Sequence, residues 1–182
     1  MKNEIKELLR HFNSEYRDGA FEKAIHLLKA IISLGKKGDF WTYSRLSSCY
    51  YELKDYHTAL TYAKKAYKLN PTSPLVLWDY AGALIMLEKE SRAIKLLRRI
   101  QEMSDDLRDH GFNNSDIKWM QSLKNDANFL IGKSYYTIHK DSLAKKSFEQ
   151  YITNRRAGTK SIYSIPKAKS YLKKLNSSSQ DN

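Results

Sequence analysis

The residues of this sequence that could do chemistry are few and poorly arranged for it. The five histidines show no metal-site spacing, and no His-Glu-x-x-His motif occurs. Asp105, Asp109 and His110 could meet at one helix end, but a solvated acidic turn is the better interpretation. The single Cys49 stands in an apolar helical stretch, which favours a buried structural thiol over a nucleophile. We therefore predict no catalytic residue and no metal site.

Gly132-Lys133-Ser134 resembles the end of a phosphate-binding loop. That motif needs a glycine five residues before Gly132, where Ala127 stands, and a strand in front of it. The tripeptide instead lies in a helical pattern, so we reject this interpretation. A glycine-rich dinucleotide fingerprint and a kinase signature are also missing from the sequence. We expect no cofactor and no enzymatic activity.

The composition is typical of a helical protein without disulfides. The chain has 182 residues, of which 41% are hydrophobic, with only 3 Pro and 7 Gly for tight turns. One cysteine allows no intramolecular disulfide. The longest apolar stretch, from Leu75 to Leu87, contains Asp79 and is too short for a bilayer, and the N-terminus does not resemble a signal peptide. We therefore expect a cytoplasmic protein with no transmembrane segment.

The net charge of +12 is unevenly distributed. From Lys133 to Asn182, 11 Lys and Arg residues stand against 3 acidic residues, a local net charge of +8. Such a basic C-terminal third favours an acidic protein, a nucleic acid or an anionic membrane surface as partner. A solvated face of a lysine-rich chain accounts for the same charge equally well, so both interpretations stay open at this point.

An internal repeat is the strongest signal. Ala24, Ala59, Ala93 and Ala144 recur at separations of 35, 34 and 51 residues, each inside an apolar helical pattern. Counted from Phe40, one repeat carries Tyr43, Leu46, Ser47, Tyr50, Ala59, Ala66 and Pro71. These residue types at this spacing resemble the tetratricopeptide repeat (TPR) family, and among its members a bacterial one. The other three alanines lie in weaker matches to the same pattern.

The resemblance implies an all-α fold, a right-handed superhelical solenoid of about four TPR helix pairs. We expect a single domain over 1–175, with repeats near 5–38, 40–73, 74–107 and 125–158 and a first turn one residue shorter than the others. The wide last separation predicts an insertion at 108–124 and two elongated helices, roughly 90–109 and 116–138. A capping helix over 165–175 and a disordered tail over 176–182 complete the prediction.

In this family the first helix of each pair lines a concave face that holds the ligand. The matching positions include Ser44, Asp79 and Asp126. The residues that we expect to contact a partner are Arg10, Arg17, Trp41, Arg45, Ser48, Tyr51, Trp78, Met86, Phe129, Lys133 and Tyr136. The branch that clamps chaperone tails has Asn where Arg45 stands and Arg where Asp79 stands, so we do not expect that ligand.

The resemblance implies a non-catalytic adaptor that binds an acidic, aromatic peptide or partner protein in a basic, aromatic groove. A nucleic-acid or anionic-surface binder acting through Lys133 to Lys174 is one alternative. A fixed structural subunit is another. Over residues 5–107 the architecture also resembles the TPR chaperones of bacterial secretion systems, although those chaperones are usually acidic and this chain is basic.

Overall fold

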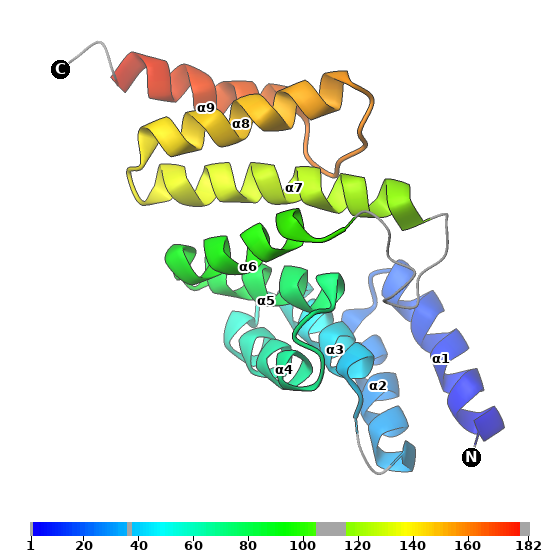
Figure 1. Ribbon diagram of the computed structural model, residues 1–182. Coiled ribbons are helices and arrows are strands. Elements are labelled where there is room, and N and C mark those ends of the chain that lie inside the picture. The colour runs from blue at the N-terminus through cyan, green and yellow to red at the C-terminus, as the bar shows by residue number, and fades with distance from the viewer. Residues whose placement is uncertain (1, 36–37, 105–115, 179–182) are drawn as a thin grey trace. The chain divides into compact units, whose positions relative to one another are not determined.

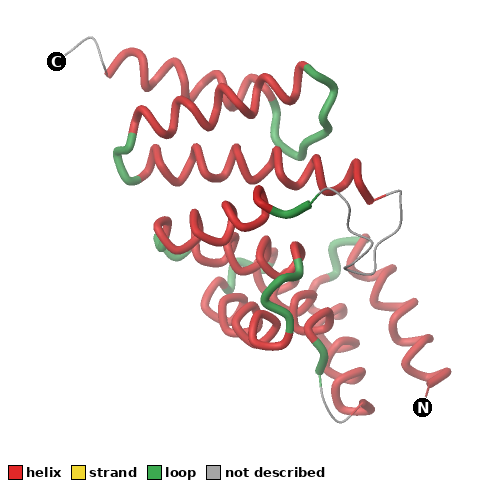
Figure 2. The backbone as a smooth tube through the Cα atoms, in the orientation of Figure 1, coloured by secondary structure: helices red, strands yellow, loops and turns green. Residues whose placement is uncertain are grey.

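The computed structural model describes residues 2–35, 38–104 and 116–178, and the regular structure of this part is entirely helical (Figures 1 and 2). The helices are α1 (Lys2–Arg17), α2 (Phe21–Gly35), α3 (Phe40–Glu52), α4 (Tyr56–Leu69), α5 (Pro74–Met86), α6 (Glu90–Glu102), α7 (Asp116–Thr137), α8 (Asp141–Arg156) and α9 (Ile165–Ser178). The predicted all-α helical-repeat fold is confirmed. In the described residues no helix has both the length and the apolar character that a bilayer span requires.

The chain divides into two compact units, which are described one at a time. Unit 1 is Met1–Glu88 and contains α1 to α5, while unit 2 is Lys89–Asn182 and contains α6 to α9. Local signals start several helices. Asp39 and Asp55 cap α3 and α4 by accepting hydrogen bonds from backbone N–H groups, and Pro74 occupies the first turn of α5.

The same backbone turn recurs four times and confirms the repeat. Gly19, Lys54, Glu88 and His139 all have positive φ, and each stands five residues before one of the four repeat alanines. The amide of each turn residue donates to the carbonyl three residues earlier. Every turn spans three residues, so the prediction of a shorter first turn was wrong. The extra residue of the first repeat lies in α2, which has 15 residues where α4 has 14.

Small side chains mark the close helix contacts of unit 1. Helices α1 and α2 form one pair, α3 and α4 a second, and α5 packs against both α3 and α4. Ala24 and Ala59 are fully buried, and the Ser47 hydroxyl on α3 donates to the carbonyl of Ala59 on α4 at 2.9 Å. A larger side chain at either position of this contact would force the two helices apart.

The fourth helix pair, α7 and α8 of unit 2, follows the same rule. A Cβ atom added to Gly132 on α7 would lie 3.0 Å from the Phe148 ring on α8, and Ala93 and Ala144 are fully buried. Helix α6 packs on α7, and α9 packs along α8 at the C-terminal end of the unit (Figure 1). All four repeat alanines are therefore core residues, as the repeat predicts.

Two helix boundaries differ from the prediction. The elongated helix expected over 116–138 is present as α7, but α6 ends at Glu102 and Met103 has extended backbone, so the helix expected over 90–109 is shorter. Ser104 and two aspartates follow, and acidic residues disfavour a helix C-terminus. Helix α9 begins where expected but continues to Ser178, past the predicted end at 175. Residues 105–115 and 179–182 lie outside the described part.

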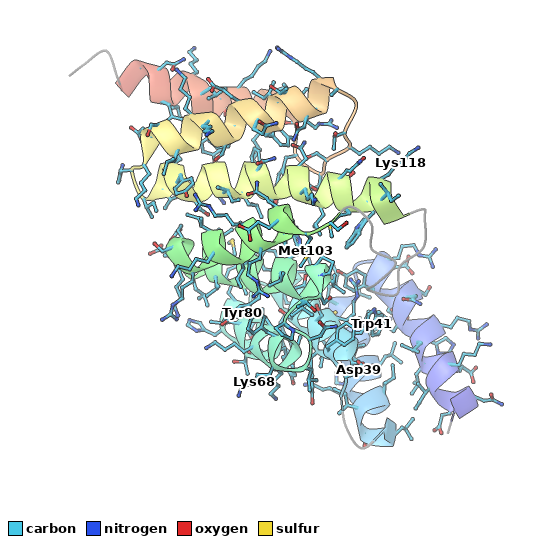
Figure 3. The ribbon with its side chains drawn as sticks, viewed as in Figure 1. Asp39, Trp41, Lys68, Tyr80, Met103 and Lys118 are labelled. Carbon is cyan, nitrogen blue, oxygen red and sulfur yellow. The ribbon has the colours of Figure 1, made fainter. Side chains whose placement is uncertain are left out.

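The close contact at Ala59 generates a test of the repeat. Replacing Ala59 by Leu adds three carbon atoms to a fully buried position on α4. We expect the free energy of unfolding to fall by about 1–3 kcal/mol because the core is overpacked. The matched control is Lys68→Leu on the exposed side of the same helix (Figure 3), which should change it by less than about 0.5 kcal/mol. Equal denaturation midpoints for Ala59→Leu and wild type would contradict the packing described.

Candidate functional site

Arg45 is the centre of a cluster of aromatic and polar side chains in unit 1. Its guanidinium carbon lies 5.9 Å from the ring centre of Tyr16 and 5.7 Å from that of Trp41, and the side chain is half-buried. We call Tyr16, Trp41, Arg45 and Ser48 the Arg45 cluster. In the described residues no carboxylate lies within ion-pair distance of Arg45. The two rings therefore flank a guanidinium group whose N–H donors make no ion pair with a carboxylate of the described residues.

Aromatic contacts between α1 and α3 fix the Arg45 cluster in place. Trp41 meets the buried Phe12 ring edge-on at 5.7 Å, and its side chain lies beside α1 (Figure 3). Tyr16 packs against Phe12 at 5.5 Å and against Phe21 at 5.6 Å. The hydroxyls of Tyr16 and Ser48 are 2.8 Å apart and share a hydrogen bond. Helix α1 is therefore part of the site because its rings orient the arginine.

A carboxyl group stands behind the Arg45 cluster. Ser44, which is fully buried on α3, donates a hydrogen bond to Asp79 on α5. Burial raises the pKa of Asp79 to about 7, and the Ser44 hydrogen bond and the positive charge of Arg45 only partly oppose this rise. Near neutral pH the carboxyl group is therefore shared between its charged and neutral forms. The charge presented beside Arg45 changes with pH.

Three further predicted contact residues extend along α3 and α5. Tyr51 is half-buried, meets Tyr56 edge-on at 5.5 Å, and lies close to Gly82 on α5, where an added Cβ would be 3.6 Å from its ring. Burial raises the pKa of Tyr51, so it stays neutral. Trp78 is half-buried and Met86 is 36% exposed. These side chains give unit 1 an apolar surface that supplements the cation.

The two arginines predicted on α1 are more loosely held. Arg10 and Arg17 are exposed, and Arg10 makes only a 3.7 Å contact with Glu7 one turn away on the same helix. A surface pair of this kind contributes little to stability. Both residues add positive charge to α1, but no ring or buried acceptor orients either of them in the described structure.

Unit 2 does not present its predicted contact residues as an open face. Phe129 is 1% exposed because Tyr163 stacks on its ring and Tyr171 meets its edge. Residues of the same chain therefore cover the Phe129 ring in this structure, and its contact with a partner stays a prediction. Lys133 is half-buried, and Tyr136 is half-buried with its ring edge-on to Tyr171 at 5.2 Å.

The structure places two of the residues that were considered for chemistry, Cys49 and Gly132. Cys49 is fully buried, as predicted, and burial raises its pKa to about 12, so the thiol stays protonated at neutral pH. The described residues contain no group of three or more His, Cys, Asp or Glu side chains that could hold a metal. Gly132 lies inside α7, which agrees with rejecting a phosphate-binding loop.

Sequence reasoning missed two parts of these sites. Tyr16 was not expected to lie against Arg45, although its spacing from Phe12 on one helix face offered a signal. Ser161 and Tyr163 were not expected to contact α7 at all. They belong to a loop that has no periodicity, so no local pattern could have placed them.

Comparisons with known proteins agree with this architecture. Residues 50–108 match the family model described as Tetratricopeptide repeat. No curated protein matches the sequence.

Several solved structures share the fold at low sequence identity. The chain matches residues 41 to the end of MamA from Desulfovibrio magneticus RS-1 with a TM-score of 0.65 and 15% identity, covering 98% of this chain and 97% of that one. The apo form of RapI gives a TM-score of 0.76 at 17% identity, covering 98% and 65%. A thermophilic TPR protein of Thermus thermophilus, TTC0263, gives 0.50 at 11% identity, covering 95% and 97%. These identities establish a shared helical-repeat fold and nothing finer.

The raised pKa of Asp79 predicts a pH-dependent stability. The folded chain favours the protonated carboxyl group more than the unfolded chain does, where the pKa of Asp is about 3.9. This contribution is complete below about pH 4 and is lost as the pH rises through about 7. Asp79→Asn keeps an oxygen acceptor for Ser44 but cannot ionise. The free energy of unfolding of wild type relative to this variant should therefore fall, by up to about 1.4 kcal/mol per pH unit, between about pH 5 and pH 7.

Denaturation curves across this pH range provide the check. The control is Glu22→Gln, which removes an exposed carboxylate on α2 and should leave a difference from wild type that varies little with pH. A difference for Asp79→Asn that is equally flat would show that the Asp79 carboxyl group is well solvated, contrary to its placement behind Arg45.

Proposed function

We propose that this chain, which matches a tetratricopeptide repeat over residues 50–108, uses unit 1 as a non-catalytic module that binds another protein or a peptide. The binding surface consists of the Arg45 cluster together with Tyr51, Trp78 and Met86. It is presented by α1, α3 and α5, the first helices of the repeats in this unit. The chain acts as an adaptor or a chaperone-like holder rather than as an enzyme.

The observation that carries this proposal is the ordered cation at Arg45. A guanidinium between two rings loses little side-chain freedom on binding, because those rings already restrict it. Its planar donors match a carboxylate. Arginine and large aromatic residues are also the types that dominate binding energy in protein interfaces. An oriented arginine that forms no ion pair with a carboxylate of the described residues can form one with an acidic partner.

The chemistry of the surface defines the class of partner. Arg45 favours an Asp or Glu side chain, and the exposed Arg10 and Arg17 on α1 add long-range attraction for an acidic segment. Trp78 and Met86 favour a large apolar side chain beside that acid. The partner is therefore a peptide segment that carries an acidic residue next to an aromatic or aliphatic one.

Nucleic-acid binding by the basic C-terminal third is less well supported than peptide binding by the surface of unit 1. Exposed lysines are spread over α8, the loop after it and α9 rather than gathered along one strip. Lys167 and Lys174 lie over aromatic rings of the same unit. These lysines occupy the ring faces on which nucleic-acid bases would stack. Positive charge alone carries little specificity.

Binding of the native partner tests the role of Arg45. Affinity purification from the native host, followed by mass spectrometry, identifies the partner, whose affinity is then measured for wild type, Arg45→Glu and Trp78→Ala. Both variants should bind at least about tenfold more weakly, because each removes a side chain of the type that acts as a hot spot. Lys64→Glu makes the same charge change at an exposed site on α4 and should have a much smaller effect.

The outcome is decided by the contrast between these variants. Arg45→Lys keeps the charge and should recover only part of the affinity, since an ammonium group cannot make paired hydrogen bonds to a carboxylate. Full retention of binding in both Arg45→Glu and Trp78→Ala would place the partner elsewhere. An affinity that falls steeply with salt and is unchanged by Arg45→Glu would instead favour an anionic polymer bound by the C-terminal lysines.

A further inference from the structure

The first helix of the last repeat, α7, is covered by a loop of its own chain. Residues 157–164, here called the linker, join the end of α8 at Arg156 to the start of α9 at Ile165 (Figure 1). The Ser161 hydroxyl donates a hydrogen bond to one carboxylate oxygen of Asp126, and the Ile162 N–H donates to the other at 3.5 Å. One carboxylate on α7 thus holds both a side chain and the backbone of the linker.

An aromatic residue anchors the linker beside that carboxylate. The Tyr163 ring stacks on Phe129 with 4.1 Å between ring centres and 13° between planes. The Tyr151 hydroxyl donates to the Tyr163 carbonyl, and the Tyr163 N–H donates to the Ser161 hydroxyl oxygen at 2.9 Å. The backbone around Tyr163 is therefore held as firmly as its ring.

The linker is contacted by side chains of α7, α8 and α9, since Lys167 on α9 lies 5.9 Å from the centre of the Tyr163 ring. Ser161 and Tyr163 face α7 and α8, while Ile162 between them is 74% exposed. Side chains 161 to 163 therefore alternate between contact with the helices and exposure, while the backbone bends at Ile162 and Tyr163. The hydrogen bonds of Ser161 and Ile162 to Asp126 and the stacking of Tyr163 on Phe129 use one hydroxyl, one backbone N–H and one ring, so none of these three contacts depends on the linker being joined to α8.

The face beneath the linker also keeps an unused donor. Arg155 donates from one terminal nitrogen to the Thr159 carbonyl at 2.7 Å, but its Nε is buried and has no acceptor among the described residues. A segment with a carbonyl or carboxylate placed slightly differently could use this donor. The linker therefore leaves one buried N–H donor of this face without an acceptor. A segment that another one can replace would leave such a donor.

We propose that the face formed by Asp126, Phe129 and Tyr151 is a second peptide-binding site, and that the linker is its internal ligand. The site takes a segment of a partner protein that carries a hydroxyl side chain two residues before an aromatic one. The partner segment displaces the linker when it binds. This site lies within unit 2 and does not rest on the function proposed for the Arg45 cluster.

Because the linker is covalently attached to the site, we expect free peptides to bind the wild-type chain weakly. A tethered ligand has an effective concentration in the millimolar range, so a free peptide must compete with it. Removing the two inward side chains of the linker empties the site without changing α7. A peptide with the sequence of the linker is a suitable probe, because the linker is the segment that occupies this face in the structure.

The test uses the full chain and a blocked synthetic peptide of residues 159–164, Thr-Lys-Ser-Ile-Tyr-Ser. The variant Ser161→Ala/Tyr163→Ala should bind this peptide at least about tenfold more tightly than wild type, since the competitor is weakened. Ile162→Ala alters only an exposed side chain and should behave as wild type. Adding Asp126→Asn to the double variant should weaken peptide binding by about tenfold or more, because a charged acceptor is lost.

Two results would overturn the proposal. One is equal peptide binding by wild type, Ile162→Ala and the double variant. The other is no binding by a double variant whose circular dichroism shows wild-type helicity.

Hydrogen exchange of the wild-type chain decides the question even where the double variant does not fold. The Ile162 amide should exchange by local opening, markedly faster than the amide of the buried residue Leu130 on α7. Exchange of the two amides at the same slow rate would show that the linker is a fixed part of the core and not a displaceable ligand.

Discussion

The fold depends on close approach of helices, which only small side chains permit. Ala59 meets α3 through the Ser47 hydroxyl, and Gly132 leaves only the space that the Phe148 ring needs. Each helix pair buries its apolar stripe against neighbours at such contacts, so a pair is not stable alone. These contacts determine which face of the first helix in each pair is buried against its neighbours and which face is left to bind a partner. The proposed function depends on the second of these faces.

The two units use this face differently. In unit 1, α3 presents Arg45 beside the rings of Tyr16 and Trp41, and no carboxylate of the described residues lies within ion-pair distance of it. In unit 2, the corresponding part of α7 is occupied by the linker through Asp126 and Phe129. One repeat geometry therefore supports a surface that we propose binds an acidic segment and a second surface that the linker of the same chain covers.

The sequence predicted the features that small-residue spacing controls. The buried alanines, the helical-repeat fold, the long α7 and the start of α9 were all predicted, because close contacts admit few residue types. The equal turn lengths were missed, since Lys54, Glu88 and His139 adopt positive φ without being glycine. The early end of α6 and the burial of Phe129 were missed because each depends on a non-repeating segment. The ligand-contact positions of the family, when they were transferred to this sequence, placed Trp41, Arg45 and Ser48 together. They could not reveal the α1 rings that orient these residues.

The central claim is that Arg45 is held ready for a partner before any partner binds. Nitrogen relaxation of the arginine side chains in the free protein measures this directly, since the Nε–H group of each arginine reports its own picosecond-to-nanosecond motion. The account predicts a restricted Arg45 guanidinium beside mobile Arg10 and Arg17, which are exposed and have no ring contact. An Arg45 side chain as mobile as those two would contradict it.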